Sequence, residues 1–150
     1  MNPDLLAKIT EVLRTTNDLT IATVRPDGYP QATTVSYVSD GLKIYFGTGA
    51  QAQKARNIAQ CAKVSITVNR PYDSWEQILG LSIGGIAERV TDPAELGLAG
   101  RLMLQKFPQV AGYLPSDAGD IAMFRVTPQV ISLLDYSHGF GHTDLVQVAA

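Results

Sequence analysis

The sequence has very little cysteine and no excess of charge of either sign. A single cysteine, Cys61, excludes an intramolecular disulfide and lacks the paired spacing of a zinc or dithiol motif. Its apolar surroundings at the end of an expected helix predict a buried thiol. The formal net charge of -2 gives no overall basic field, and the sequence shows no local basic patch that would indicate a nucleic-acid partner.

Long hydrophobic runs are also missing. Apolar stretches end at Gly, Thr, Ser or a charged residue well before the about 20 residues that a membrane-spanning helix needs, and no charged-then-apolar leader begins the sequence. We therefore expect a cytoplasmic protein without a membrane partner. The 150 residues, 45% of them hydrophobic, can bury one ordinary core, so we predict one domain over residues 1–150.

Three segments have the sequence features of helices. The first starts after the cap residue Asn2, with Pro3 in its first turn and an apolar stripe behind it. Residues 51–60 are rich in alanine and helix-forming side chains. The third helix has Asp92 as its cap and runs to about Lys106.

Segments rich in β-branched and aromatic residues alternate with turn sequences and predict strands. They are residues 19–24, 31–38, 42–48, 64–68, 78–90, 123–126 and 130–134. Two turn sequences separate the first three strands, which we expect to form a meander. The pair Gly84 and Gly85 indicates a β-bulge or a close backbone approach. From Asp135 onward the sequence predicts a loop before a short Val-rich end.

This order of elements favours an α+β protein that is mainly β. Six or seven strands arrive mostly as hairpins, with one helix before them and two between them. That order predicts an antiparallel barrel with flanking helices, because the strand–helix alternation of a parallel doubly wound sheet is missing.

One segment, residues 45–57, joins a strand end to a helix start. Gly47 and Gly49 allow close backbone approach, the helix start offers unpaired N–H groups, and Lys54 adds a positive charge. A phosphate group suits this combination, although the spacing matches neither of the common nucleotide-binding motifs. The alternative is that Lys54 and Arg56 are simply solvated residues on an exposed helix face.

An ordered set of short motifs makes the chain similar to the pyridoxamine 5′-phosphate oxidase-like family. The motifs are residues 21–24, 27–30, 33–37, 40–41, 45–48, Lys54, Asn57, 61–66 and 85–89. This resemblance implies a split β-barrel of the FMN-binding type. It also implies a homodimer that holds FMN in a cleft between its subunits.

The resemblance assigns cofactor contacts to particular residues. It places the strand backbone at residues 33–35 beside the flavin ring and its ribityl chain, and Thr48 and Lys54 at the phosphate with Gln53 next to them. Asn57 is expected to be a structural hydrogen-bonding residue. The full set of expected cofactor contacts is Thr33, Thr34, Val35, Gly47, Thr48, Gln53, Lys54 and Phe140.

The C-terminal tail departs from the family's namesake oxidase. Residues 136–144 lack its Trp- and Arg-containing segment, and Gly80 stands where the oxidase has a glutamine, so we do not expect oxidation of pyridoxamine phosphate. The resemblance instead implies that Phe140 folds over the flavin of the partner subunit, and the sequence alone leaves open closure over the flavin of its own subunit. His138 and His142 suggest metal ligands, but a loop with two glycines gives them no fixed helical face, and we predict no metal.

No arrangement of side chains in the sequence indicates acid–base or nucleophilic catalysis. A bound flavin would therefore supply the reactivity. The resemblance implies an FMN-dependent oxidoreductase that transfers hydride or electrons to a small molecule. Two alternatives remain open: the same fold with F420 or haem as its cofactor, and a flavin-binding or stress-response module without turnover.

Overall fold

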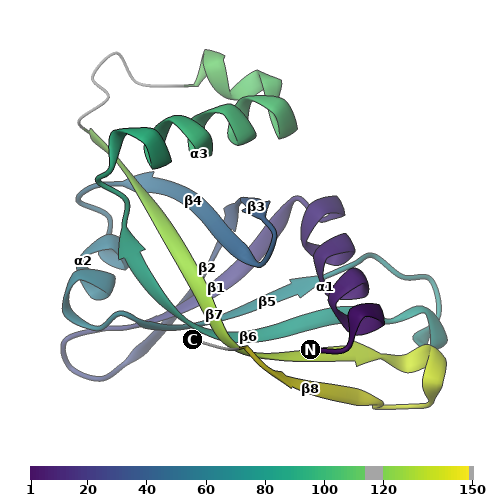
Figure 1. Ribbon diagram of the computed structural model, residues 1–150. Coiled ribbons are helices and arrows are strands. Elements are labelled where there is room, and N and C mark those ends of the chain that lie inside the picture. Colours follow the sequence, from purple (N-terminus) through teal and green to yellow (C-terminus); the bar gives the residue numbers. More distant parts are fainter. Residues whose placement is uncertain (114–119, 149–150) are drawn as a thin grey trace.

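The computed structural model describes residues 1–113 and 120–148, and their strands form one curled antiparallel sheet (Figure 1). The sheet order is β2 (Pro30–Ser36), β1 (Asp18–Val24), β5 (Lys63–Asn69), β6 (Leu79–Arg89), β7 (Ile121–Asp135), β4 (Lys43–Gly49) and β3 (Val38–Asp40). A further strand, β8 (Thr143–Gln147), pairs with β7.

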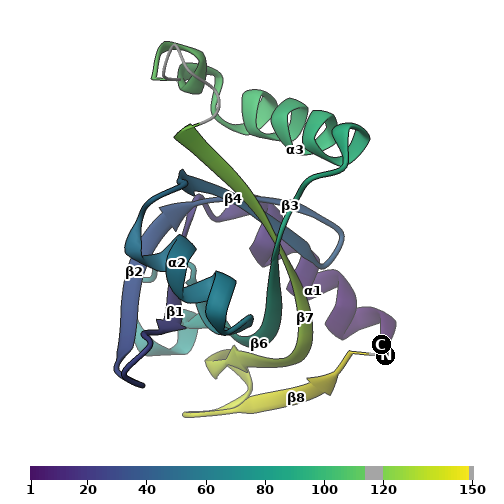
Figure 2. The ribbon, with the colours of Figure 1, turned by 90° about the vertical axis from the view of Figure 1, so that its left-hand side faces the viewer.

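The sheet curls until β2 approaches β4, although the two strands do not pair (Figure 2). This arrangement is a barrel that is split on one side. The predicted fold class, an antiparallel split β-barrel with flanking helices, is confirmed.

β7 is one continuous strand, so the prediction of two short strands around Pro128 is wrong. Pro128 is tolerated because it lies opposite Gly85, where the pairing of β6 with β7 shifts register, and a bulge needs no ladder hydrogen bond from its proline. A Cβ atom on Gly85 would lie 2.9 Å from the Thr127 carbonyl oxygen. The bulge and the close backbone approach predicted at Gly84 and Gly85 are therefore both present.

The predicted meander is also wrong, because β4 pairs with β3 and β7 rather than with β2. The segment predicted as one strand over residues 31–38 divides at Tyr37, which is fully buried and donates from its hydroxyl to the Leu13 carbonyl oxygen at 2.7 Å. The chain changes course there to start β3. The tail contains a 3-10 turn, η4 (Tyr136–His138), and β8, so it is more regular than the predicted loop.

Three α-helices flank the sheet: α1 (Pro3–Thr15), α2 (Gln53–Gln60) and α3 (Pro93–Lys106). α1 buries Ile9, Val12 and Leu13 in the main core inside the curl. None of the helices in the described residues combines the length and the apolar content that a bilayer span requires.

α3 lies on the outside of the sheet, above β3 and β4 in Figure 1. Its Ala99 packs with Tyr45 and Val90 in a second, smaller core. Its first turn is tied to the sheet, because Glu95 accepts hydrogen bonds from the Tyr45 hydroxyl at 2.8 Å and from the Arg125 guanidinium at 2.6 Å. A charge-assisted pair of this kind fixes the helix over β4 and β7.

The end of β7 is held by another charged pair. Asp135 is 5% exposed, and one of its carboxylate oxygens lies 2.8 Å from the Lys8 amino group of α1. Burial alone would raise the pKa of Asp135, but hydrogen bonds from Lys8 and from the Ser137 hydroxyl and amide together lower it to about 2. The ionised form of Asp135 is therefore favoured by folding.

We expect Asp135 to make the protein acid-sensitive in a defined window. Its pKa is lower in the folded chain than its ordinary value of 3.8. Its contribution to the free energy of unfolding is therefore complete above pH 3.8 and is lost as the pH falls toward 2. The free energy of unfolding should fall by about 2 kcal/mol between about pH 5 and pH 2 on account of this group. Urea unfolding across this range measures the effect.

The Asp135→Asn variant should lack that part of the pH dependence. Asp40→Asn, a change at an exposed aspartate of β3, should keep it. If the free energy of unfolding of Asp135→Asn fell with pH as steeply as that of the wild-type protein, this account would be contradicted.

Candidate functional site

An apolar hollow of about 260 Å³ lies between the edge strand β2, the strands β4 and β7, and α3 with the 3-10 turn that follows it, η2 (Pro108–Gly112). Its lining residues are Val35, Ser36, Gly47, Met103, Val110, Ile121 and Met123. A Cβ atom at Gly47 would lie 3.5 Å from Ile121 Cγ2, so glycine keeps this wall of the hollow flat. A flat apolar group suits such a lining.

β2 offers free backbone groups beside this hollow. It pairs with β1 on one side, and the described strands include none on its other side. Alternate N–H and C=O groups of an antiparallel edge strand therefore have no ladder partner. Thr33, Thr34 and Val35 lie on this strand, so the backbone predicted to run beside the cofactor is at an open sheet edge.

The hydroxyl of Thr33 is an unsatisfied polar group. Among the described side chains, Thr33 Oγ1 is the buried nitrogen or oxygen atom that has no hydrogen-bond partner. Leaving a buried hydroxyl unpaired costs on the order of 1–3 kcal/mol. A polar ligand group that reaches this strand would remove the cost, so the residue present fits a cofactor with hydroxyl or carbonyl groups.

The start of α2 lacks the side-chain cap that the other two helices have. The side chains of Asn2 and Asp92 accept hydrogen bonds from the first turns of α1 and α3. α2 instead has Ala52 as its cap residue, with no side-chain cap bond and no acidic residue in its first turn. It also carries Lys54 there, and a cation at the positive end of a helix is unfavourable without a nearby anion. This helix start is therefore suited to a phosphate.

Thr48 and Lys54, the two predicted phosphate contacts, belong to consecutive elements of the chain. Thr48 is near the end of β4, and a short connection of residues 50–52 leads directly into α2. Both side chains are half-buried, and Lys54 forms no ion pair with the described residues. Their role as phosphate contacts stays a prediction.

Gln53 belongs to a hydrogen-bond network that fixes α2 to the sheet. Gln53 Nε2 donates to Asn57 Oδ1 at 2.7 Å, and Asn57 Nδ2 donates to Thr23 Oγ1 at 3.0 Å and to Gln31 Oε1 at 3.2 Å. Asn57 is fully buried, so these bonds satisfy a costly group. Asn57 therefore has the structural role expected of it, and Gln53 positions the helix start through it.

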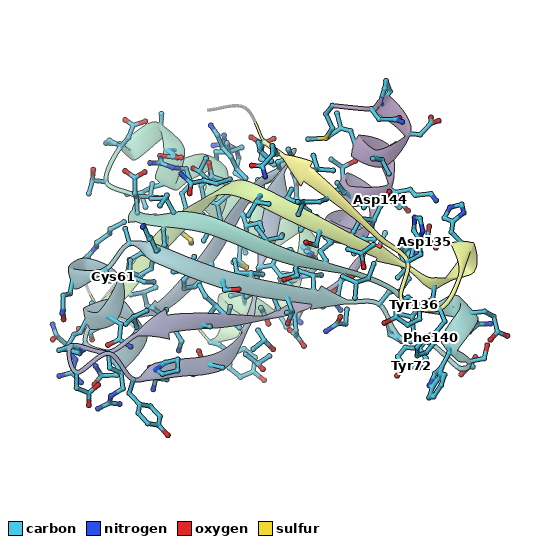
Figure 3. The ribbon with its side chains drawn as sticks, turned by 90° about the horizontal axis from the view of Figure 1, so that it is seen from below. Cys61, Tyr72, Asp135, Tyr136, Phe140 and Asp144 are labelled. Atoms are coloured by element: carbon cyan, nitrogen blue, oxygen red, sulfur yellow. The ribbon has the colours of Figure 1, made fainter. Side chains whose placement is uncertain are left out.

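Phe140 lies at the opposite end of the molecule (Figure 3). Its ring is 80% exposed and packs 5.6 Å from the Trp75 ring and 5.5 Å from the Tyr136 ring, measured between centroids. The seven residues of β5 separate this end from the end of α2, a distance of roughly 20 Å. One chain therefore does not bring Phe140 to the other predicted cofactor contacts.

Two further expectations can be compared with the structure. Cys61 is half-exposed rather than buried, because it is the C-cap residue of α2 at the surface bend into β5.

The histidines of the tail face separate carboxylates, with His138 3.5 Å from Asp135 and His142 3.1 Å from Asp144. The described residues contain no group of three His, Cys, Asp or Glu side chains that could hold a metal ion.

Sequence reasoning missed the side of the hollow that α3 and β7 supply. Met103, Ile121 and Met123 line it, and none of them lies in a motif. The available signal was the partly exposed apolar surface of α3, which includes Leu104 at 46% exposure. That surface says nothing about which strands α3 covers, because this depends on the tie between Glu95 and Arg125.

Comparison with known proteins places the chain in a family. The family model described as pyridoxamine 5′-phosphate oxidase matches residues 5–135, and the chain belongs to this family. No curated protein matches the chain.

Several solved structures share the fold. A haem-binding protein from Mycobacterium smegmatis superposes with a TM-score of 0.83 at 23% identity, over 98% of this chain and 59% of that one. General stress protein 26 from Bacillus anthracis gives 0.72 at 19% identity, over 96% and 98% of the two chains. An F420 reductase gives 0.64 at 29% identity, over 81% and 94%. The chain thus spans 59% of the haem-binding protein's length.

The unpaired hydroxyl of Thr33 leads to a stability prediction. Thr33→Val should raise the free energy of unfolding of the ligand-free protein by about 1 kcal/mol, because it removes a buried polar group that has no bond to lose. Chemical denaturation of the two proteins measures the difference. Thr34→Val, an exposed change on the same strand, should stay within about 0.5 kcal/mol. A loss of stability in Thr33→Val would show that the hydroxyl already has a partner.

Proposed function

We propose that this protein binds FMN in the hollow beside β2 and acts as a flavin-dependent oxidoreductase on a small molecule. The observation that carries the proposal is the combination of an open strand edge, an apolar hollow and an uncapped helix start that carries Lys54. These three features match the three parts of FMN: the flat ring, the polar ribityl chain and the phosphate. Membership of the family supports the same choice.

Each part of this site has a separate binding role. Val35, Gly47 and Met123 would contact the ring and exclude water from one face of it, and the edge of β2 would bond its polar atoms. Thr48 and Lys54 would hold the phosphate at the positive end of α2. When bound, FMN supplies hydride or single-electron transfer, and the protein supplies position and electrostatics.

A second copy of the chain would complete the site. The edge strand β2 contributes Val35 and Ser36 to the hollow, while the aromatic cluster of Trp75, Tyr136 and Phe140, in which Trp75 and Phe140 are exposed, lies at the far end of the same chain. In a homodimer that places the aromatic cluster of one chain against the hollow of the other, Phe140 of the partner subunit would cover the flavin ring. An aromatic plane in that position stacks well on a flavin. We propose this assembly for a cytoplasmic enzyme.

We expect Lys54 to control affinity for FMN. Lys54→Gln should weaken FMN binding about tenfold to hundredfold, because it removes a charge-assisted contact to the phosphate and leaves the ring contacts intact. Quenching of flavin fluorescence during titration with the apoprotein measures the change. Riboflavin, which has no phosphate, should bind the variant and the wild-type protein equally.

A matched control separates this effect from a general loss of charge. Lys43→Gln removes an exposed cation from β4 and should leave the affinity for FMN unchanged. Equal affinity of Lys54→Gln and wild-type protein for FMN would remove Lys54 from the phosphate site.

Hybrid dimers test whether Phe140 acts across the interface. In a hybrid of one Lys54→Gln chain and one Phe140→Ala chain, a shared site leaves one cleft with both changes and the other with neither. We therefore expect each hybrid to bind one FMN with wild-type affinity, while both variant homodimers bind weakly. A site formed within a single chain would give hybrids in which no cleft has wild-type affinity.

F420 and haem are the alternative cofactors, and proteins bearing those names share the fold. Haem has an observation in its favour, because the hollow contains the thioethers of Met103 and Met123, and methionine sulfur is a known axial ligand. The absorption spectrum of the purified protein distinguishes FMN, F420 and haem. A Soret band would identify haem and a deazaflavin spectrum would identify F420, and either result would contradict FMN as the cofactor.

Turnover decides between an enzyme and a flavin-binding or stress-response module. Reduction of the bound flavin by NADH or NADPH, followed by reduction of an acceptor, is expected of an oxidoreductase. A flavin that is bound but never turned over would support the module.

A further inference from the structure

A second hollow adjoins α2, and Figure 2 shows this helix with β1 and β2 on one side and β6 and β7 on the other. It has a volume of about 380 Å³ between α2 and the strands β6 and β7. Its floor is apolar and buried: Ile58 of α2 is 4% exposed, Ala87 of β6 is 1% exposed, and Phe124 of β7 is 3% exposed. Pockets for small molecules have this size and this kind of lining.

Small side chains leave this hollow unfilled. Ala55 and Ala59, one turn apart on α2, face it, and Ala50 and Ala87 complete the narrow part of its lining. Protein interiors are ordinarily close-packed, and larger side chains such as leucine on this face of α2 would occupy the space. The chain therefore keeps an apolar cavity open at its surface.

Two guanidinium groups stand at the rim. Arg56 of α2 donates to the neutral amide oxygen of Gln53 at 2.9 Å, and Arg89 ends β6 without an ion pair to any described residue. Glu88 also lines the hollow, but this single carboxylate is opposed by the two guanidinium groups of Arg56 and Arg89. The rim therefore carries net positive charge above an apolar floor.

We propose that this hollow binds a small apolar monocarboxylate, with its hydrocarbon body on Phe124 and its carboxylate between Arg56 and Arg89. Guanidinium groups pair with carboxylates in a planar, often bidentate geometry that lysine cannot reproduce. The apolar floor gives no partner to a second charged group, so a dicarboxylate or a sugar phosphate fits poorly. The site is separate from the hollow proposed for the flavin ring, because the two hollows share no lining residue.

Titration calorimetry with phenylacetate as the probe tests this site. The wild-type protein should bind one phenylacetate per chain, and the neutral phenylacetamide should bind at least about tenfold more weakly, because it loses the charge-assisted contacts. Equal binding of the two compounds, or no binding of phenylacetate at millimolar concentration, would overturn the proposal.

Three variants locate the bound probe. Arg89→Gln should weaken phenylacetate binding about tenfold, and Ala59→Leu, an addition at an exposed helix position, should abolish it by filling the hollow. Arg101→Gln, at an exposed arginine of α3, should bind as the wild-type protein does. Full binding by Ala59→Leu, with its fold intact by circular dichroism, would place the probe elsewhere and overturn the proposal.

Competition with FMN separates this site from the proposed cofactor site. Saturating FMN should leave the phenylacetate affinity unchanged, and displacement by FMN would place the carboxylate in the hollow beside β2 instead. Because phenylacetate binding needs no flavin, failure of FMN to bind would refute the proposed function and leave this site supported.

Discussion

The backbone pairing of β7 determines where the functional features of this molecule lie. Its first half pairs with β4, its second half with β8, and β6 runs along nearly its whole length. One strand of 15 residues therefore joins the end of the barrel that carries α3 to the end that carries the tail. The bulge at Gly85 and Pro128 lets this long strand bend as the sheet curls.

Two consequences follow from this strand. Arg125, near its middle, holds Glu95 of α3, so α3 covers the hollow that receives Met103 from the helix and Met123 from the strand. Asp135, at its end, holds Lys8 of α1 and leads into the turn that presents Phe140. The hollow and the exposed aromatic cluster are thus kept at opposite ends of one rigid element. A site that uses both features needs two chains.

The position of α2 gives the site its electrostatic character. The network around Asn57 fixes this short helix to β1 and β2 although the helix has no side-chain cap at its start. Free N–H groups, the helix dipole and Lys54 then favour an anion at one point. The same placement leaves a second hollow on the Ala55 side of the helix. One element therefore contributes to two separate surfaces with different chemistry.

The sequence predicted local features well and long-range pairing poorly. The caps at Asn2 and Asp92 depend on residues beside them in the sequence, and the structure contains both. The bulge at Gly84 and Gly85 and the structural role of Asn57 are also present, although their partners lie on distant strands. The partner of β4 could not be read from its own residues, because a strand's alternation of side chains does not specify its neighbour.

Predicted site residues divide in the same way. Thr48 and Lys54 lie close together in the sequence, one near the end of β4 and the other in the first turn of α2. Phe140 was expected at the same cofactor, but its distance from them depends on the length of β5 and on the path of β7. The sequence did not indicate that Met103 and Ile121 line the hollow beside β2, because only the packing of α3 on the sheet brings them there.

The central claim is that two copies of the chain form the flavin site. Sedimentation velocity of the FMN-loaded protein, recorded at the visible absorption of flavin, tests it most directly. The account predicts that the flavin signal sediments with a species of twice the 16.1 kDa chain mass. A flavin signal that sediments with the single chain, or apart from the protein, would contradict it.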